Sequence, residues 1–372
     1  MHYLVTGHTG FKGAWLTMWL TSQGHQVSGL ALDPEPGALF ETAELHPLLA
    51  HDIRADIRDS ANVMDALRVT APDVVIHLAA QPLVRESYLN PRWTFETNVM
   101  GTLNVLEAVQ QTPSVKAQLI ITTDKVYRNV NQVAGYVEPD ALGGDDPYSA
   151  SKAMADLLTH SWVTSFGGPP TAVARAGNVI GGGDVCKDRL IPDVIAALAS
   201  GKAPVLRYPN AVRPWQHVLD CINGYLMLVD SLLESSGSFS DHGAWNFGPD
   251  ESSFVTVGEV ARLVAKRWGS DLDWVAAPET EFHESSLLAL DARKSENQLG
   301  WKNYLGFQQA IQWTVDWYLC VREGISERES SGSQISDFLS IRERPSADPD
   351  NQEVRHTLSV KGDHEGRGVQ NA

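Results

Sequence analysis

The stretch His2-Tyr3-Leu4-Val5-Thr6-Gly7-His8-Thr9-Gly10-Phe11-Lys12-Gly13 decides the fold of this chain. Its first five residues are an apolar run typical of a strand, and the apolar pattern of residues 14–22 predicts a helix. Between them, Gly7 permits a tight turn, Gly10 lets the backbone approach a pyrophosphate, and Gly13 lets the helix pack closely while its N-terminal amides face the anion. The spacing is G-x-x-G-x-x-G, and a glycine pattern alone also occurs in ordinary turns.

Further apolar runs alternate with helical patterns after this unit. Strands are expected at residues 26–32, 51–57, 73–80, 116–122 and 172–175, and helices at 61–69, 91–111 and 148–165. The run at 73–80 is continuously apolar, as in a parallel strand buried on both faces. The alternation predicts right-handed βαβ units and an α/β, Rossmann-type doubly wound parallel sheet, which binds ligands at its carboxyl edge.

Asp33 directly follows the second expected strand. A carboxylate at this place hydrogen-bonds the hydroxyls of an adenosine ribose and repels a 2′-phosphate, so we predict NAD rather than NADP as the cofactor. The alternative interpretation is a cap of a helix or turn before Pro34, because Asp favours such positions.

Two further motifs carry chemistry: Thr122-Thr123-Asp124-Lys125 at the end of a strand, and Tyr148-Ser149-Ala150-Ser151-Lys152 at the start of a helix. Tyr148 and Lys152 stand at i and i+4 and share one helix face. An ammonium group beside a phenol lowers the pKa of the phenol, which would make Tyr148 a base for a sugar or alcohol hydroxyl. Alone, Y-x-x-x-K is also common on solvated helix faces, and Thr-Asp-Lys also fits a cap at a strand end.

Three units are expected along the chain: an NAD-binding domain at residues 1–176, a smaller substrate lobe mainly at 177–324 and interleaved with the first, and a disordered tail at 325–372. The glycine-rich run at 177–184 suggests close approach of the backbone to a ligand or a mobile loop. The tail is rich in Ser, Glu, Arg, Pro and Asp and poor in aromatic residues, which favours disorder.

A group of basic residues follows the glycine-rich run: Lys187, Arg189, Arg207, Arg213 and His217. Each alone fits an exposed surface charge. Together, in an acidic chain, they suit the binding of a nucleotide diphosphate.

Composition excludes several classes of partner. The 372 residues include 46 Asp and Glu against 29 Lys and Arg, for a formal net charge of -17, so neither nucleic acid nor an anionic membrane is expected as a partner. The three cysteines are far apart and form no C-x-x-C, so we expect no disulfide framework and no metal site. The first strand begins almost at Met1 and no run reaches the roughly 18 to 20 apolar residues that span a bilayer, so a soluble cytoplasmic protein is expected.

The glycine turn, the acid after the second strand and Y-x-x-x-K occur in order, and over residues 1–322 the chain resembles the extended short-chain dehydrogenases/reductases. Within that superfamily, five longer blocks resemble the CDP-glucose 4,6-dehydratase family: residues 7–13, 77–85, 122–125, 175–184 and 213–218. The chain departs from this family's pattern in having Thr123 in place of the usual serine, a shorter lead before the first strand and a longer tail.

The resemblance implies dehydration of CDP-D-glucose to CDP-4-dehydro-6-deoxy-D-glucose with bound NAD as a recycled hydride carrier, a step of deoxysugar and lipopolysaccharide biosynthesis. It implies that Tyr148 takes the C4 hydroxyl proton, that Lys152 holds the phenolate and the nicotinamide ribose, and that Thr123 hydrogen-bonds the C4 oxygen. Asp124 would protonate the C6 hydroxyl, while Lys125 either abstracts the C5 proton or stabilises the enolate. A homodimer or higher homo-oligomer, built on the helices at 91–111 and 148–165, is also implied.

The resemblance also implies the binding residues. Expected cofactor contacts are Gly7, Thr9, Gly10, Phe11, Lys12, Gly13, Asp33, Asp56, Ile57, Leu78, Ala79, Ala80, Gln81, Asn98, Thr122, Tyr148 and Lys152. Expected contacts to the nucleotide sugar are Arg85, Asn178, Arg189, Leu190, Arg207, Arg213 and His217.

Two other functions stay open. An NAD-dependent nucleotide-sugar 4-epimerase would keep the glycine turn, Tyr148 and Lys152 but needs no acid aimed at C6, such as Asp124. A non-catalytic NAD-binding regulator would need only the cofactor half of the site.

Overall fold

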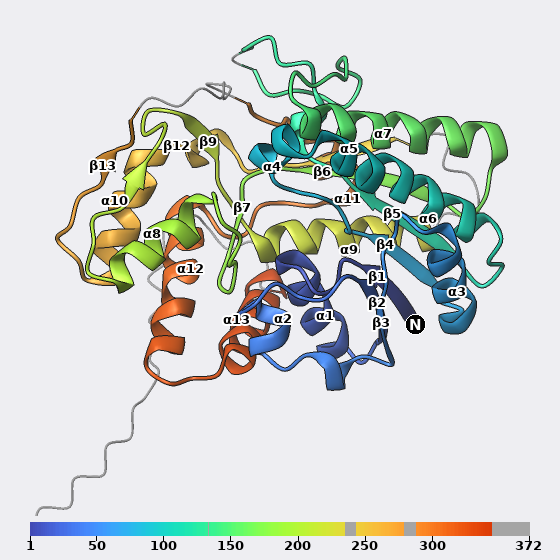
Figure 1. The fold of residues 1–372 in the computed structure, drawn as a ribbon, viewed down its shortest axis with the longest axis horizontal. Helices are drawn as coiled ribbons and strands as arrows, with labels where there is room; N and C mark the ends of the chain where they lie inside the picture. Colours follow the sequence, from blue (N-terminus) through green and yellow to red (C-terminus); the bar gives the residue numbers. More distant parts are fainter. Residues whose placement is uncertain (133, 235–242, 279–287, 344–372) are drawn as a thin grey trace, which may run out of the picture.

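The computed structural model describes residues 1–132, 134–234, 243–278 and 288–343. Its centre is a seven-stranded parallel sheet of order β11-β6-β5-β4-β1-β2-β3 (Figure 1). The strands are β1 His2–Thr6, β2 Gln26–Ala31, β3 His51–Arg54, β4 Val74–His77, β5 Ala117–Ile121, β6 Thr171–Ala176 and β11 Ala244–Phe247. The strand order reverses between β1 and β4, as in a doubly wound sheet, so the predicted Rossmann-type fold is confirmed.

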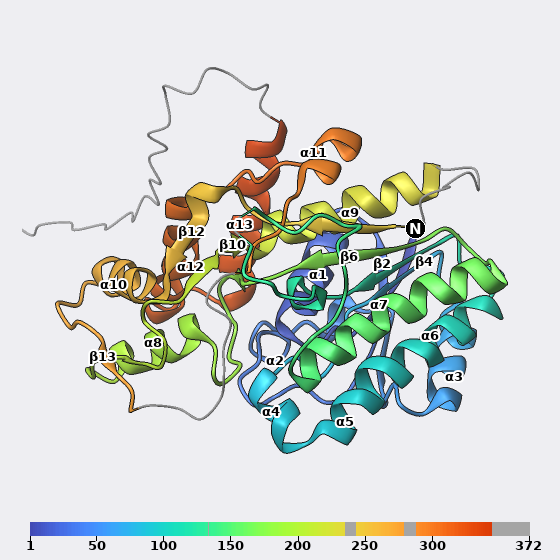
Figure 2. The ribbon, with the colours of Figure 1, turned by 90° about the horizontal axis from the view of Figure 1, so that it is seen from above.

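Two helical layers cover the sheet (Figure 2). On one face Val5, Ile76 and Leu119 pack with α1 Phe11–Ser22 and α9 Val218–Glu234. On the other face Leu4 and Val75 pack with α3 Ser60–Thr70 and α6 Gly101–Gln110, while β5 and β6 carry α7 Pro147–Phe166. Successive strand residues point to opposite faces, which explains why these strands are apolar without interruption.

A smaller lobe lies beside the sheet, at the left of Figure 1. Its core joins α8 Leu190–Ala199, α10 Val257–Trp268 and α12 Phe307–Arg322. Three two-stranded pairs complete it: β7 Val179–Ile180 with β10 Gln216–His217, β9 Val212–Pro214 with β12 Phe254–Thr256, and β8 Val205–Leu206 with β13 Val275–Ala276. Since α9 and β11 return to the central sheet, the second half of the chain contributes to both parts of the molecule.

The helix expected at residues 91–111 is interrupted. The chain forms α5 Pro91–Phe95, a π-helical turn at Glu96–Met100 and then α6. The short helices α2 Leu39–Thr42, α4 Val84–Leu89 and α11 Arg293–Leu299 complete the set around the sheet. A π turn inserts one extra residue per turn, which the apolar pattern of the sequence does not reveal.

The disorder expected for residues 325–372 is wrong for α13 Glu327–Glu343; residues 344–372 lie outside the described part. Phe338 of α13 is fully buried and meets the rings of Trp19 and Tyr304 edge-on. Trp317 Nε1 donates to Ser331 Oγ at 2.9 Å. The burial of Ile335 and Phe338 and the ring contacts of Phe338 outweigh a polar composition here, because the composition of the whole helix does not reveal its narrow buried face.

None of the helices in the described ranges has the length and apolarity to cross a membrane.

Candidate active site

A cavity of about 1190 Å³ opens at the carboxyl ends of β1, β4, β5 and β6, against the smaller lobe. Gly7, Leu78, Thr122 and Gly177 line it from these four strand ends. Its volume exceeds the roughly 300 to 1,000 Å³ typical of a site for one small molecule. The cavity therefore has room for two ligands side by side.

The glycine turn forms one wall of this cavity. Gly7 has a φ of +75°, and a Cβ on it would lie 2.7 Å from the amide nitrogen of Ala79. A Cβ on Gly13 would lie 2.2 Å from the carbonyl oxygen of Gly7. Positions 7 and 13 thus accept only glycine, and the helix N-terminus that opens onto the cavity suits a pyrophosphate. These residues fit the NAD expected from the sequence.

Most of the predicted cofactor residues line the cavity. They are Gly7, Thr9, Gly10, Phe11, Lys12, Gly13, Asp56, Ile57, Leu78, Ala79, Ala80, Thr122, Tyr148 and Lys152. Hydrogen bonds from Arg58 lower the pKa of Asp56, so an ionised carboxylate lines this part of the cavity. Asp33 is exposed beyond the end of β2 and outside the lining, where Leu32 stands instead, so its contact with a ribose stays a prediction.

Tyr148 and Thr123 meet inside the cavity. Asp146 caps α7 by accepting from Ser149 N at 2.9 Å, and Pro147 opens the helix, so Tyr148 lies in its first turn. Burial raises the pKa of Tyr148 to about 12, although its hydrogen bond with the Thr123 side chain acts in the opposite direction. The buried phenol is therefore a proton donor in this state.

Lys152 lies one turn further along α7. Its Nζ donates to the carbonyl oxygen of Ile121 at 3.0 Å, and burial lowers its pKa to about 7, with Lys12 as a second cause. The expectation that Lys152 lowers the pKa of Tyr148 is wrong for this structure, because desolvation dominates and the ammonium group is bound to a backbone carbonyl.

Asp124 is held from both sides at the end of β5. Thr123 Oγ1 donates to its Oδ1 at 2.8 Å, and Asn178 Nδ2 donates to its Oδ2 at 3.4 Å. A Cβ on Gly177 would lie 2.0 Å from Oδ2, so only glycine allows this backbone to pack on the carboxylate. Lys125 follows on the same 3₁₀ turn, half-buried and lining the cavity.

Cationic side chains line the cavity: Arg85 from the sheet side, and Arg189, Arg207 and Arg213 from the lobe side. Asn178 and Leu190 line it as well, as predicted. Arg189 pairs with Asp184 at 2.8 Å. Arg85 pairs with Asp188 at 2.9 Å, and Arg207 pairs with the same carboxylate.

Besides Asp33, three predicted contact residues do not line the cavity. His217 is fully buried in the core, edge-on to Trp15 and Trp313, and burial lowers its pKa to about 3. Gln81 and Asn98 are buried behind the wall, where Asn98 Oδ1 accepts from Gln81 N at 2.8 Å and Asn98 Nδ2 donates to Ser151 at 2.8 Å. The predicted contacts of these three residues with substrate or cofactor are wrong; they support the wall instead.

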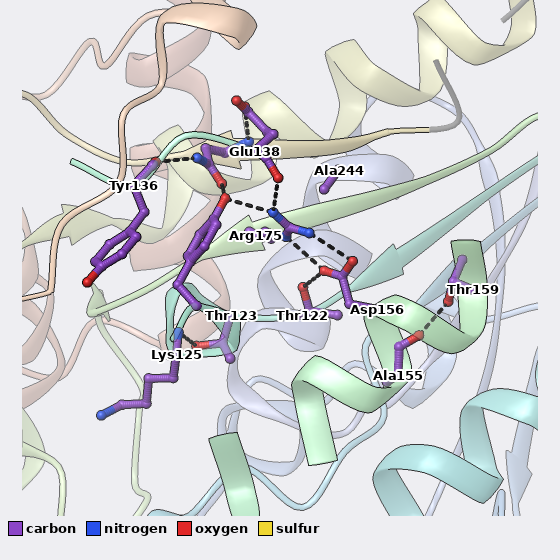
Figure 3. A network of polar contacts seen from close by, with 12 residues as sticks. Thr122, Thr123, Lys125, Tyr136, Glu138, Ala155, Asp156, Thr159, Arg175 and Ala244 are labelled. Carbon is purple, nitrogen blue, oxygen red and sulfur yellow. Dashed lines mark hydrogen bonds and ion pairs between the residues drawn. The ribbon is translucent and has the colours of Figure 1, made fainter. Parts of the chain in front are cut away.

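A buried charged network lies directly behind the reactive residues (Figure 3). Arg175, at the end of β6, pairs through two nitrogens with Asp156 of α7, at 2.8 and 2.9 Å. The same guanidinium donates to Tyr127 at 2.7 Å, and Thr122 donates to Asp156 at 3.4 Å. Figure 3 shows Lys125 extending away from this network.

The predicted site omitted both residues of this pair and two acidic residues of the cavity wall, Asp188 and Asp193. The spacing could have found Asp156, because it stands four residues after Lys152 and therefore lies on the face of α7 that carries the reactive groups. Within the described ranges, no group of three or more His, Cys, Asp or Glu residues could hold a metal ion.

Comparisons with known proteins agree with this geometry. The model of the GDP-mannose 4,6 dehydratase family matches residues 4–314. A CDP-glucose 4,6-dehydratase of Salmonella typhimurium is 41% identical over 349 residues, covering 91% of this chain and 96% of that protein. A dTDP-glucose 4,6-dehydratase of Xanthomonas campestris pv. campestris is 30% identical, covering 85% of this chain and 93% of that protein.

Two solved structures are similar in fold. The dTDP-glucose 4,6-dehydratase of Streptomyces venezuelae, determined with NAD and TYD bound, has a TM-score of 0.74 at 25% identity, covering 87% of this chain and 98% of that chain. The UDP-glucose 4-epimerase of Thermus thermophilus, determined with NAD, has a TM-score of 0.73 at 26% identity, covering 85% of this chain and 98% of that chain.

Proposed function

The chain belongs to the GDP-mannose 4,6 dehydratase family of NAD-dependent nucleotide-sugar enzymes, and we propose that it removes water from CDP-D-glucose to give CDP-4-dehydro-6-deoxy-D-glucose. One observation carries the proposal: a Tyr148-Thr123 pair suited to alcohol oxidation and a positioned acid, Asp124, line the same cavity. The likeness to a CDP-glucose 4,6-dehydratase supports the choice of nucleotide.

NAD, when bound against the glycine turn, supplies a reversible hydride acceptor for the sugar carbon C4. The wall of Gly7, Gly10 and Gly13 would hold its pyrophosphate, and Asp56 and Ile57 would flank its adenine. Lys152, whose Nζ lies at the end of β5, would bind the nicotinamide ribose.

Tyr148 takes the C4 hydroxyl proton, and Thr123 hydrogen-bonds the C4 oxygen. A phenol whose pKa is about 12 is almost entirely protonated at neutral pH and cannot accept a proton, so a cation that favours the phenolate must approach it when the ligands bind. Lys152 shares its helix face and would serve once its ammonium group leaves the carbonyl oxygen of Ile121.

Elimination then acts on the 4-keto sugar, whose C5 hydrogen the ketone makes acidic. The C5 proton leaves, the C6–O bond breaks, and Asp124 donates the proton that converts the C6 hydroxyl to water. Lys125 either abstracts the C5 proton or stabilises the enolate through its charge. Return of the hydride to C6 and of a proton to C5 would complete the 6-deoxy sugar and leave the cofactor as it began.

Asp124 separates this reaction from the two other candidates. An epimerase needs no acid aimed at C6, and a regulator needs neither Tyr148 nor Asp124. The contacts of Asp124 with Thr123, Gly177 and Asn178 support a carboxylate built for a specific place.

A homodimer in the cytoplasm, contributing deoxysugars for lipopolysaccharide, completes the proposal. Apolar side chains are exposed on the outer helical layer, with Met100, Met154 and Leu157 at 47%, 46% and 55% of their full exposure. Such residues on neighbouring helices support an interface between two copies.

The test is incubation of the purified protein with CDP-, dTDP-, UDP- and GDP-glucose, followed by the alkali-induced absorbance of a 4-keto-6-deoxy sugar. We expect the signal with CDP-glucose. Asp124→Asn should abolish it while absorbance of reduced nicotinamide accumulates, because oxidation at C4 does not need this acid. A C4 epimer in place of the ketone would establish the epimerase, and binding of NAD with no conversion of any sugar would favour the regulator.

A further inference from the structure

One carboxylate bridges the two parts of the molecule across the cavity. Asp188, in the loop between β7 and α8, accepts from Arg85 Nη1 of α4 at 2.9 Å. It also accepts from Arg207 Nη1, next to β8, while its backbone carbonyl oxygen accepts from Arg207 Nη2 at 3.0 Å. Arg85 belongs to the sheet side and Arg207 to the lobe side, and all three residues line the cavity.

The backbone at Asp188 is unusual for a residue with a side chain. Its φ is +65°, in the left-handed region that only glycine adopts freely and that Asn and Asp tolerate best. Residues held in this region cluster at ligand sites and switches, where the surrounding contacts maintain them. The two arginine contacts are such a constraint, since they hold the carboxylate over the cavity.

The charge of the cavity makes these contacts significant. Arg85 and Arg207 are two of the cations that suit a diphosphate, yet both are already paired with an anion of the chain itself. The side chain of Asp188 is 40% exposed, and those of Arg85 and Arg207 are 46% and 30% exposed. Ion pairs this accessible are weak enough to exchange one partner for another.

We propose that Asp188 is an internal substitute for the substrate's diphosphate: it holds Arg85 and Arg207 together while no nucleotide is bound, and the diphosphate displaces it. This inference rests on the proposed function, because it takes a nucleoside diphosphate sugar as the ligand. Displacement frees two guanidinium groups from opposite sides of the cavity to close on one anion. When the product leaves, Asp188 takes the arginines back, so it weakens nucleotide binding and favours release.

The test is the affinity for CDP, measured by titration calorimetry on the holoenzyme and two variants of this residue. Asp188→Asn keeps the left-handed backbone acceptable and removes the charge, and Asp188→Gly suits that backbone and removes the whole side chain. Both should bind CDP about three- to tenfold more tightly than the unmodified protein, since the competing pairs of exposed groups are removed. Cytidine, which has no phosphate, should bind all three forms equally.

Asp145→Asn is the matched control for charge. Asp145 also lines the cavity, from the loop before α7, and is exposed, so its substitution removes the same unit of charge and leaves the Asp188 bridge in place. Its effect on CDP affinity should be smaller than that of either Asp188 variant. Equal tightening by all three variants would overturn the proposal, because it would reduce Asp188 to one negative charge among others.

Other outcomes separate this inference from the function on which it rests. Weaker or unchanged CDP binding in both Asp188 variants would overturn the inference alone, and weaker binding would make Asp188 a direct ligand or a support of Arg207. Tightening for UDP, dTDP or GDP, with no binding of CDP, would keep the inference and overturn CDP-glucose as the substrate. Binding of none of the four diphosphates by the unmodified protein would overturn both.

Discussion

At the scale of single residues, the pKa values of Tyr148 and Lys152 oppose the roles that their spacing suggests. Burial leaves the phenol with a pKa of about 12 and the lysine with a pKa of about 7. The group that titrates near neutral pH is thus Lys152, although Tyr148 is the proposed base. A charge on Lys152 favours the phenolate only when the ammonium group lies near the phenol, so the reaction needs Lys152 charged and away from the carbonyl oxygen of Ile121.

Removal of the Tyr148 hydroxyl tests the base directly. We expect Tyr148→Phe to lower kcat by about 10²- to 10⁴-fold, the usual contribution of a positioned acid or base, with KM little changed because the ring remains. Initial rates of ketone formation, with NAD binding followed by fluorescence, measure both effects. Tyr304→Phe is the matched control, since Tyr304 lies against α13 and outside the cavity lining. A kcat within threefold of the unmodified protein would remove Tyr148 from the reaction.

The reactive residues could be predicted from the sequence because each belongs to a local motif. Tyr148, Lys152 and Asp124 lie at fixed offsets from a strand end or along one helix face, and such spacing survives folding. His217 could not be assigned correctly, because burial between Trp15 and Trp313 depends on contacts between distant segments. A basic residue type says nothing of whether its environment is the cavity or the core.

At the scale of elements, the pair of Arg175 and Asp156 joins β6 to α7 behind the reactive groups (Figure 3). Both side chains are almost fully buried, at 4% and 6% exposure. Thr122 of the β5 end and Tyr127 beyond the 3₁₀ turn are tied to the same pair. The helix that carries Tyr148 and the turn that carries Asp124 are therefore fixed to each other through one ion pair.

Loss of one member of this pair should destabilise the fold strongly. Asp156→Asn leaves the guanidinium of Arg175 buried without its counter-charge, so we expect the free energy of unfolding to fall by about 3 to 5 kcal/mol. Urea unfolding followed by circular dichroism measures it. The exposed pair of Arg68 and Asp65 in α3 is the control, and Arg68→Ala should cost no more than about 1 kcal/mol. Equal small losses in both variants would contradict the role assigned to the buried pair.

The helix α13 should behave as part of the core. Phe338→Ala removes a fully buried ring between Trp19 and Tyr304, for an expected loss of about 3 to 5 kcal/mol in the free energy of unfolding. Ser333→Ala, on the exposed side of the same helix, should lie within about 0.5 kcal/mol of the unmodified protein. The same urea experiment measures both, and a silent Phe338→Ala would mean that the segment is disordered, as its composition suggests.

The helices and strands could be predicted where the spacing of apolar residues agrees with the positions of turn residues such as glycine. The glycine turn after residues 2–6 and the uninterrupted apolar run at 73–80 gave the sheet and its parallel order. The sequence did not predict α13, because Ile335 and Phe338 are its two buried apolar residues among many Ser and Glu residues. It did not predict the π turn at Glu96–Met100 either, because one added residue leaves the apolar pattern of the segment intact. Both departures depend on packing against segments far away in the chain.

At the scale of the whole molecule, two buried ionisable groups, His217 and Asp220, change the stability of the fold in opposite directions as the pH varies between about 5.5 and 7.5. Burial lowers the pKa of His217 to about 3 from an ordinary 6.5, so the unfolded chain binds the proton first and stability is lost as the pH falls. Burial raises the pKa of Asp220 to about 8 from an ordinary 3.8, against the backbone hydrogen bonds of Tyr304 and Leu305. The folded chain keeps that proton, so stability is lost as the pH rises.

Two variants separate these contributions, because the difference between a variant and the unmodified protein cancels all other groups. Lowering the pH from about 7.5 to 5.5 should cost the folded state roughly 1 kcal/mol through His217 and return roughly 2 to 3 kcal/mol through Asp220. His217→Phe should therefore be less damaging at the lower pH, and Asp220→Asn should be more damaging there. Urea unfolding at both pH values gives the two differences. Parallel pH profiles for all three proteins would mean that neither group changes its proton on unfolding, whereas profiles that diverge in opposite directions would show that two neutral buried groups oppose each other in the pH dependence of stability.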